Sequence, residues 1–170
     1  LTKESETAKN IRDISLDREH LVKERTRLKN QLHTLLYRMF NTTYAKEFKD
    51  PFSVKALRHW MKSRPKGVSP FLIRSMKRKV QRLMDIRKDI QELEQELETL
   101  IRESGHTIQT ASGCGVVIAA EIIGEVGDIS RFHSPAQLAK YAGCAPRECS
   151  SGKTVRWRKT RSGNRRLNRA

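Results

Sequence analysis

The sequence predicts a mainly α-helical protein. Only 6% of its 170 residues are aromatic although 36% are apolar, which is enough for a helical core but little for an aromatic-rich β-sandwich. Two long segments without internal proline carry apolar side chains three and four residues apart, the spacing of one face of a helix. We therefore expect a long antiparallel helical coiled-coil arm, followed by a small helical domain with a helix-hairpin-helix and a short β element.

The first long helix is expected to run from about Ser5 to Phe40. Its apolar residues and two arginines alternate in steps of three and four, which is the heptad spacing of a coiled-coil seam. The seam consists of Ile11, Ile14, Arg18, Leu21, Arg25, Leu28, Leu32, Leu35 and Met39. At ~1.5 Å per residue this helix is roughly 50 Å long.

A helical connector over residues 41–68 is expected next, because Asp50-Pro51 and Arg64-Pro65 interrupt the helical spacing. It encloses a short helix predicted at Ser53–Lys62. The second long helix is predicted to begin at Ser69-Pro70, a cap residue followed by proline at the first helical position, and to end near Ser104-Gly105. Its seam is Ile73, Met76, Val80, Leu83, Ile86, Ile90, Leu93, Leu97 and Leu100.

Residues 1–104 thus form the expected arm, and residues 105–170 a second domain. The apolar stripes of the two long helices can be buried against each other within one chain or against another protomer. Arg18 and Arg25 interrupt the first seam, and polar seam positions specify the register of an assembly. We predict an arm that also joins protomers into a homo-oligomer, with a hairpin inside one chain as the alternative.

The positive charge is concentrated in two parts of the chain. Lys and Arg number 35 against 19 Asp and Glu, a net charge of +16. Residues 55–88 carry 12 basic and 1 acidic side chains, and residues 146–170 carry 9 and 1. Such clustering is typical of a surface that binds a polyanion. A solvated helix face is the alternative for the first block.

The composition also indicates a cellular location. No segment has the ~18 consecutive apolar residues of a membrane span, so no membrane contact is expected. The N-terminal residues lack the apolar region of a signal peptide, and the three cysteines fit neither a disulfide framework nor a zinc pair. We expect a cytoplasmic protein, and the resemblance to a known family given below implies a nucleoid-associated protein of a prokaryotic cell. Because the chain begins at Leu1, we expect it to be part of a longer one.

Small residues become frequent after residue 105. Gly113-x-Gly115 followed by a small-residue apolar segment predicts a helix-hairpin-helix, in which the glycines permit a tight turn and a close approach of backbone N–H groups to a phosphate. A turn that only packs two core helices is the alternative. Ser134-Pro135 is predicted to open a further helix.

Three acidic residues in this segment raise the question of a metal site. Glu121, Glu125 and Asp128 are close enough in sequence to hold a divalent ion together. Three acids without a further ligand make a poor site, however. We therefore expect solvated carboxylates and no metal bound by this chain.

The basic tail contains a pair of serines followed by glycine. Ser150-Ser151-Gly152 precedes a short strand predicted at Thr154–Trp157, in a segment rich in Arg and Lys. A hydroxyl flanked by cations suits nucleophilic attack on a phosphodiester, because guanidinium groups neutralise the phosphate and stabilise the transition state. By residue type alone, the same tripeptide is an ordinary linker.

An ordered series of short motifs runs through the C-terminal part. They are Gly113-x-Gly115 with Ala119-Ala120, Glu125-x-Gly127-Asp128-Ile129-x-Arg131-Phe132, Leu138-Ala139-x-Tyr141-Ala142-Gly143, Pro146-Arg147, Ser151-Gly152 and Gly163-Asn164-Arg165-x-Leu167. With these motifs, residues from about 108 to 170 resemble the C-terminal transposase domain of the IS-one-ten insertion-sequence family, the bridge-RNA-guided, DEDD-type transposases related to Piv-type DNA invertases. The long helices resemble that family's coiled-coil region.

This resemblance implies a DNA transposase or recombinase whose serine nucleophile becomes covalently linked to DNA as a phosphoserine. Ser151 falls on the nucleophile position, with Ser150 as the alternative. An N-terminal RuvC-like domain outside these residues would hold divalent metal ions, expected to be Mg²⁺, on four carboxylates, so this part alone is expected to be inactive. Double-stranded DNA and a guide (bridge) RNA are the expected partners.

The residues expected to contact nucleic acid are two glycines and the polar residues of the basic tail. They are Gly113, Gly115, Arg147, Lys153, Arg156, Arg158, Lys159, Arg161, Asn164, Arg165 and Arg166. The alternative function is a non-catalytic helix-hairpin-helix module that binds nucleic acid and dimerises through a coiled-coil arm. In that case Ser150-Ser151-Gly152 is only a loop.

Overall fold

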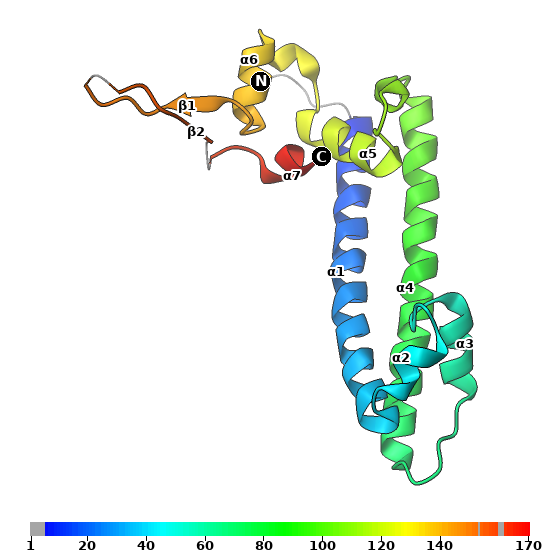
Figure 1. Cartoon of the computed structure of the whole chain (residues 1–170). Helices are drawn as coiled ribbons and strands as arrows, with labels where there is room; N and C mark the ends of the chain where they lie inside the picture. Colours follow the sequence, from blue (N-terminus) through cyan, green and yellow to red (C-terminus); the bar gives the residue numbers. More distant parts are fainter. Residues whose placement is uncertain (1–5, 153, 160–161) are drawn as a thin grey trace. The chain divides into compact units, whose positions relative to one another are not determined.

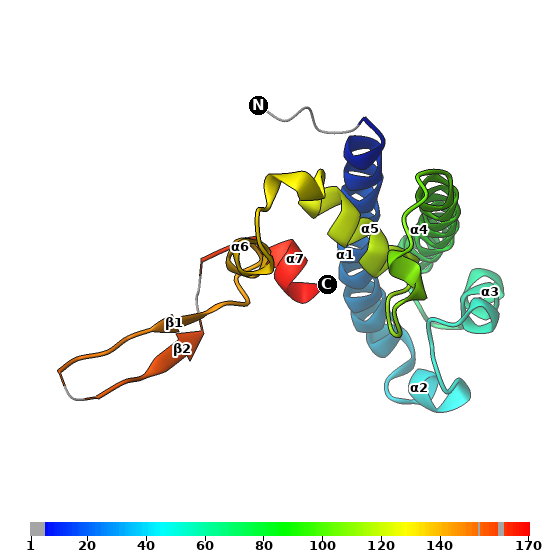
Figure 2. The ribbon, with the colours of Figure 1, turned by 90° about the horizontal axis from the view of Figure 1, so that it is seen from above.

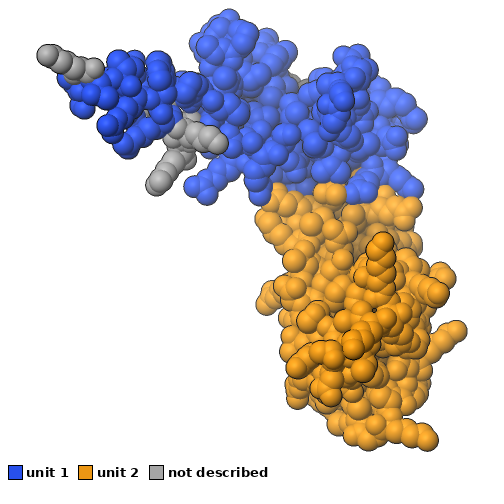
Figure 3. All heavy atoms as spheres, in the orientation of Figure 1, with its two compact units in different colours: residues 1–16, 94–170 blue, residues 17–93 orange. Residues whose placement is uncertain are grey.

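The computed structural model describes residues 6–152, 154–159 and 162–170. Over these ranges the protein is mainly α-helical, as predicted (Figure 1). Two long helices, α1 (Glu6–Phe40) and α4 (Pro70–Glu103), have almost the predicted bounds. The chain divides into two compact units, residues 17–93 and residues 1–16 with 94–170 (Figure 3). The ends of both long helices belong to the same compact unit as the C-terminal core, and the expected domain boundary at residue 105 stays a prediction.

In the unit of residues 17–93, α1 and α4 run antiparallel. The Arg82 guanidinium on α4 donates to both carboxylate oxygens of Glu24 on α1, at 2.9 and 3.2 Å, and Lys79 Nζ donates to Gln31 Oε1 at 2.7 Å. A later residue on α1 therefore meets an earlier residue on α4. This unit contains the hairpin within one chain, and association with a second protomer stays a prediction.

The connector packs aromatic side chains beside these helices. It forms α3 (Val54–Lys62), which was predicted, and α2 (Thr43–Glu47), which was not. The hydroxyl of Ser53 caps α3 by accepting from the Ala56 amide at 3.3 Å. Trp60 is 1% exposed, and its indole nitrogen donates to the Pro51 carbonyl at 3.0 Å. The core consists of Leu32, Leu36, Tyr44, Ala56, Leu57, Trp60, Met76, Val80 and Leu83.

The predicted seams are largely the buried faces of the long helices. In α4 the residues Met76, Val80, Leu83, Ile86, Ile90 and Leu97 are buried. The seam of α1 differs in its middle, where Leu21 and Leu28 are only half-buried. Leu36, which lies outside the predicted seam, is fully buried because it belongs to the core that the connector helps to form.

The second unit has its own core, built on α5 (Val116–Val126). The ends of the long helices meet α5 through Ile11, Leu97, Ile101, Ala119, Ala120 and Ile123. Gly124 allows a close approach, because a Cβ at this position would lie 2.8 Å from the Arg12 Cα of α1.

The remaining elements of this unit are short. They are the 3₁₀ turns η1 (Ile108–Thr110) and η2 (Ile129–Arg131), the helices α6 (Pro135–Tyr141) and α7 (Arg165–Arg169), and the strands β1 (Pro146–Glu148) and β2 (Trp157–Lys159). The Ser134 hydroxyl caps α6 as predicted. The segment before Gly113 is a single 3₁₀ turn in place of the first helix of the expected helix-hairpin-helix. Within the described ranges, no helix combines the length and the hydropathy needed to cross a membrane.

Nearby residues on α1 provide a test of the core of residues 17–93. Leu36→Ala should lower the free energy of unfolding by about 2–5 kcal/mol, because it leaves a cavity among fully buried side chains. Arg38→Ala, at an exposed position two residues further along α1, should change it by less than about 0.5 kcal/mol. Urea denaturation followed by circular dichroism measures both values. Equal destabilisation by the two variants would contradict this packing.

Candidate active site

Ser151 lies at the tip of a β-hairpin that projects from α6 and α7 (Figure 2). Strands β1 and β2 pair antiparallel, with Arg147 opposite Arg158. The same register continues toward the tip, where the Cys149 amide donates to the Arg156 carbonyl at 2.7 Å. Ser151 and Thr154 then exchange two backbone hydrogen bonds of 3.2 Å.

Gly152 follows Ser151 directly after this bridge and has φ +56°. Two-residue hairpin turns need positive φ at this position, which glycine adopts without a steric penalty. The strand predicted at Thr154–Trp157 is displaced in the structure: its last residue begins β2, and Thr154 forms an isolated bridge with Ser151.

The register separates the two serines onto opposite faces of the hairpin. Cross-strand partners share a face, and so do residues two apart on one strand. Ser151 therefore lies on the face of Arg156 and Arg158, both of which are exposed. This face combines a hydroxyl with two guanidinium groups.

Ser150 lies on the other face, with Val155 and Trp157. Its hydroxyl donates to a carboxylate oxygen of Glu148. Val155 and Trp157 are 63% and 62% exposed. Next to Ser150, the described side chains of this face are thus one carboxylate and two exposed apolar groups.

The base of the hairpin is held by a close backbone approach. A Cβ on Gly143 would lie 2.6 Å from the Ser162 carbonyl oxygen, and a Cβ on Gly163 would lie 2.6 Å from the Gly143 nitrogen. The Asn164 amide donates to the Tyr141 carbonyl at 2.8 Å beside this contact. The two ends of the hairpin segment, after α6 and before α7, are thereby joined.

Beneath the base lies a buried carboxylate, Glu125 of α5. Its side chain is 3% exposed and accepts from Arg166 Nη1 at 2.8 Å and from the side-chain amide of Asn164. The Glu125 carbonyl accepts from the Tyr141 hydroxyl and from an Arg131 guanidinium nitrogen, each at 3.3 Å. Helices α5, α6 and α7 thus meet at one acidic residue.

This arrangement corrects one interpretation of the sequence. Glu125 is a buried ion-pair partner and not a solvated carboxylate. Arg166, whose side chain is 15% exposed, also donates to the buried Ser15 hydroxyl of α1 at 3.0 Å. Asn164 caps α7, because its side-chain oxygen accepts from the backbone amides of Arg166 and Leu167. Arg166 and Asn164 thus have structural roles inside the fold, and their nucleic-acid contacts stay a prediction.

The other predicted contact residues have varied positions. Arg165 is exposed on α7. Gly113 has φ +83°, and Gly115 is the N-cap of α5, with space around both for an approaching group. Their phosphate contact stays a prediction. Arg147 and Lys159 belong by their backbone to β1 and β2. Lys153 and Arg161 lie outside the described residues.

Asp128, the third acidic residue of the segment after residue 105, has a local structural role. Hydrogen bonds from Ser130 hold the pKa of its carboxyl below the ordinary value, and its side chain caps η2 through the Ser130 amide at 2.8 Å. In the part of the chain that the structure describes, no three His, Cys, Asp or Glu side chains are grouped as metal ligands.

Comparison with known proteins gives two matches. The model of the transposase family IS116/IS110/IS902 matches residues 105–170. The chain is 30% identical over 139 residues to the transposase for insertion sequence element IS1111A of Coxiella burnetii (strain RSA 493 / Nine Mile phase I). The match covers 79% of this chain and 37% of that transposase, so the chain spans little more than a third of its relative. No solved structure matches.

Neighbouring arginines on α7 distinguish a structural role from a binding role. Arg166→Ala should lower the free energy of unfolding of the chain by up to about 3–5 kcal/mol, because the buried Glu125 carboxylate loses its closer cation and keeps only Arg12 of α1, whose guanidinium lies 3.8 Å away. Arg165→Ala removes the same charge from an exposed position and should change it by less than about 0.5 kcal/mol. Urea denaturation of both variants provides the comparison. If Arg166→Ala leaves the stability unchanged and weakens DNA binding, Arg166 contacts nucleic acid, as the sequence predicted.

Proposed function

Residues 105–170 belong to the IS116/IS110/IS902 transposase family, and from this premise we propose that the chain is the part of a DNA transposase that carries its serine nucleophile, Ser151. One observation carries the proposal: Ser151 occupies the tip of a hairpin on the same face as Arg156 and Arg158. Ser150, on the other face, is bonded to Glu148.

The proposed reaction is a transesterification. Ser151 Oγ attacks the phosphorus of a DNA phosphodiester, so that an Oγ–P bond forms and the bond from phosphorus to the leaving strand breaks. The serine hydroxyl loses its proton, and the leaving oxygen gains one. Guanidinium groups on the same face stabilise the additional negative charge on the phosphate. Because the phosphoserine keeps the free energy of the phosphodiester, the reverse attack rejoins strands without ATP.

The transposase needs parts beyond the residues described. We propose that carboxylates outside this chain hold the divalent metal ions, expected to be Mg²⁺, and that a guide RNA is bound together with double-stranded DNA. The two basic blocks, residues 55–88 and 146–170, support binding of a polyanion.

A pair of serine variants tests the nucleophile in the complete transposase that contains this chain. Ser151→Ala should abolish the covalent protein–DNA adduct formed on a suicide DNA substrate, while DNA binding survives. Ser150→Ala should retain the adduct. Denaturing gels with labelled DNA, and mass spectrometry of the linked peptide, measure the adduct and its position. Undiminished recombination by Ser151→Ala would refute the assignment and favour the non-catalytic binding module.

We also propose that the arm joins protomers. Tyr37 near the end of α1 and Phe71 near the start of α4 are 52% and 61% exposed and lie at the same end of the antiparallel pair. Light scattering during size-exclusion chromatography of the chain should give a mass above that of the monomer, and Phe71→Ser should lower it. A monomeric mass of the unaltered chain at high concentration would refute self-association.

A further inference from the structure

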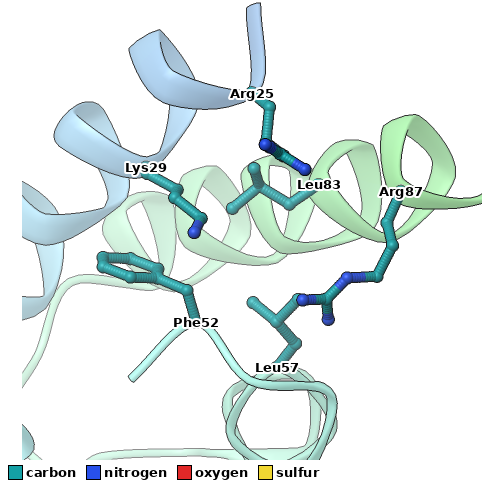
Figure 4. Close-up of a pocket in the computed structure, with 6 residues that line it drawn as sticks. All are labelled: Arg25, Lys29, Phe52, Leu57, Leu83 and Arg87. Atoms are coloured by element: carbon teal, nitrogen blue, oxygen red, sulfur yellow. The ribbon is translucent and has the colours of Figure 1, made fainter. Parts of the chain in front are cut away.

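The unit of residues 17–93 carries a pocket between α1, the connector and α4 (Figure 4). Three cationic side chains line it: Arg25 and Lys29 from α1, and Arg87 from α4. The buried Leu57 and Leu83 and the half-buried Phe52 form its apolar wall. The Lys29 ammonium lies 5.4 Å from the centre of the Phe52 ring, a cation–π contact that holds it at the pocket.

The positive charges of this pocket are not neutralised by the protein. No acidic residue is among the six residues that line it. Other cations of the same helices are paired, since Arg82 contacts Glu24 and Lys88 contacts Glu92. Within the described ranges, no ion pair joins Arg25, Lys29 or Arg87 to a carboxylate. The pocket itself is shallow, with a volume of about 10 Å³, which is room for little more than a water molecule. Three like charges at its rim repel each other, and an anion at its mouth would relieve that repulsion.

The position of Arg25 also indicates an anion-binding site. In the sequence it interrupts the apolar seam of α1, and a polar residue there is explained by register alone. In the structure its half-buried side chain extends toward Leu83 and the pocket (Figure 4). An arginine at the edge of an apolar core is well suited to binding a phosphate, because its planar fork of donors matches the phosphate oxygens.

We propose that Arg25, Lys29 and Arg87 bind a phosphate of a nucleic-acid backbone. The surrounding block, residues 55–88, carries 12 basic and 1 acidic side chains and supplies the wider positive surface that a polyanion needs. The arm then holds nucleic acid at a site separate from the hairpin, and the site does not depend on the chemistry of Ser151.

The test compares two sets of charge-neutralising variants of the whole chain. The pocket variant replaces Arg25, Lys29 and Arg87 by Gln. The control also replaces three basic residues by Gln, all of them exposed and outside residues 55–88: Arg27 and Arg38, about half a turn around α1 from Lys29, and Lys46 of α2. Binding to a short DNA duplex, a short RNA duplex and inorganic phosphate is measured over a range of salt concentrations by fluorescence anisotropy or calorimetry.

The pocket variant should bind DNA or RNA roughly tenfold or more weakly at low salt, and the slope of log K against log salt should become shallower by about 1 for each phosphate that the protein no longer neutralises. The control should change much less. Equal weakening in both variants would overturn the proposal in favour of diffuse attraction. If the pocket variant binds inorganic phosphate more weakly but binds nucleic acid as tightly as the unaltered chain, the site takes free phosphate and not a nucleic-acid backbone, and the proposal is wrong.

A measurement on the unaltered chain covers the case in which the pocket variant does not fold. Lysine acetylation followed by mass spectrometry should show that bound nucleic acid protects Lys29 several-fold more than Lys46, an exposed lysine of α2. Equal protection of the two lysines would contradict the site.

Discussion

Glu125 places a negative charge inside the C-terminal domain, and its neighbours are arranged around that charge. A buried carboxylate loses its hydration, at a high cost in free energy unless a cation and hydrogen-bond donors replace the water. Arg166 and Asn164 supply these groups. Both residues follow the β-hairpin in the sequence, whereas Glu125 precedes it. Their bonds to Glu125 therefore close the loop that carries the hairpin.

This closure has a consequence for the serine. The backbone contact of Gly143 with Gly163 fixes the two ends of the hairpin segment next to each other. Strand pairing then carries the register without interruption to the turn at Gly152. The exposed Ser151 therefore has a defined position relative to the arginines on its face. A serine in an unpaired linker has no such defined position. Backbone pairing within the described residues thus connects the exposed serine to the helices around the buried ion pair.

The extent to which sequence predicted this structure depends on how local each signal is. Helical spacing and caps such as Ser53 and Ser134 are local, and the helices that they mark were predicted closely. The role of Glu125 was not predicted, because its partners Asn164 and Arg166 lie 39 and 41 residues away and no local pattern around Glu125 indicates them. The charge count of the tail likewise led to the prediction that Arg166 contacts a phosphate. A charge count does not tell whether a side chain points into the fold or into solvent. The proposed chemistry of Ser151 comes from resemblance and not from spacing.

The two tryptophans of the chain occupy opposite environments, one in each compact unit. Trp60 is enclosed among aromatic side chains in the unit of residues 17–93, and Trp157 stands in solvent on the hairpin. Their emission spectra and their access to a soluble quencher must therefore differ, because indole fluorescence responds to contact with water. Replacing either one by phenylalanine leaves a chain with a single tryptophan, in the arm or at the hairpin, whose emission can be excited selectively without any added label.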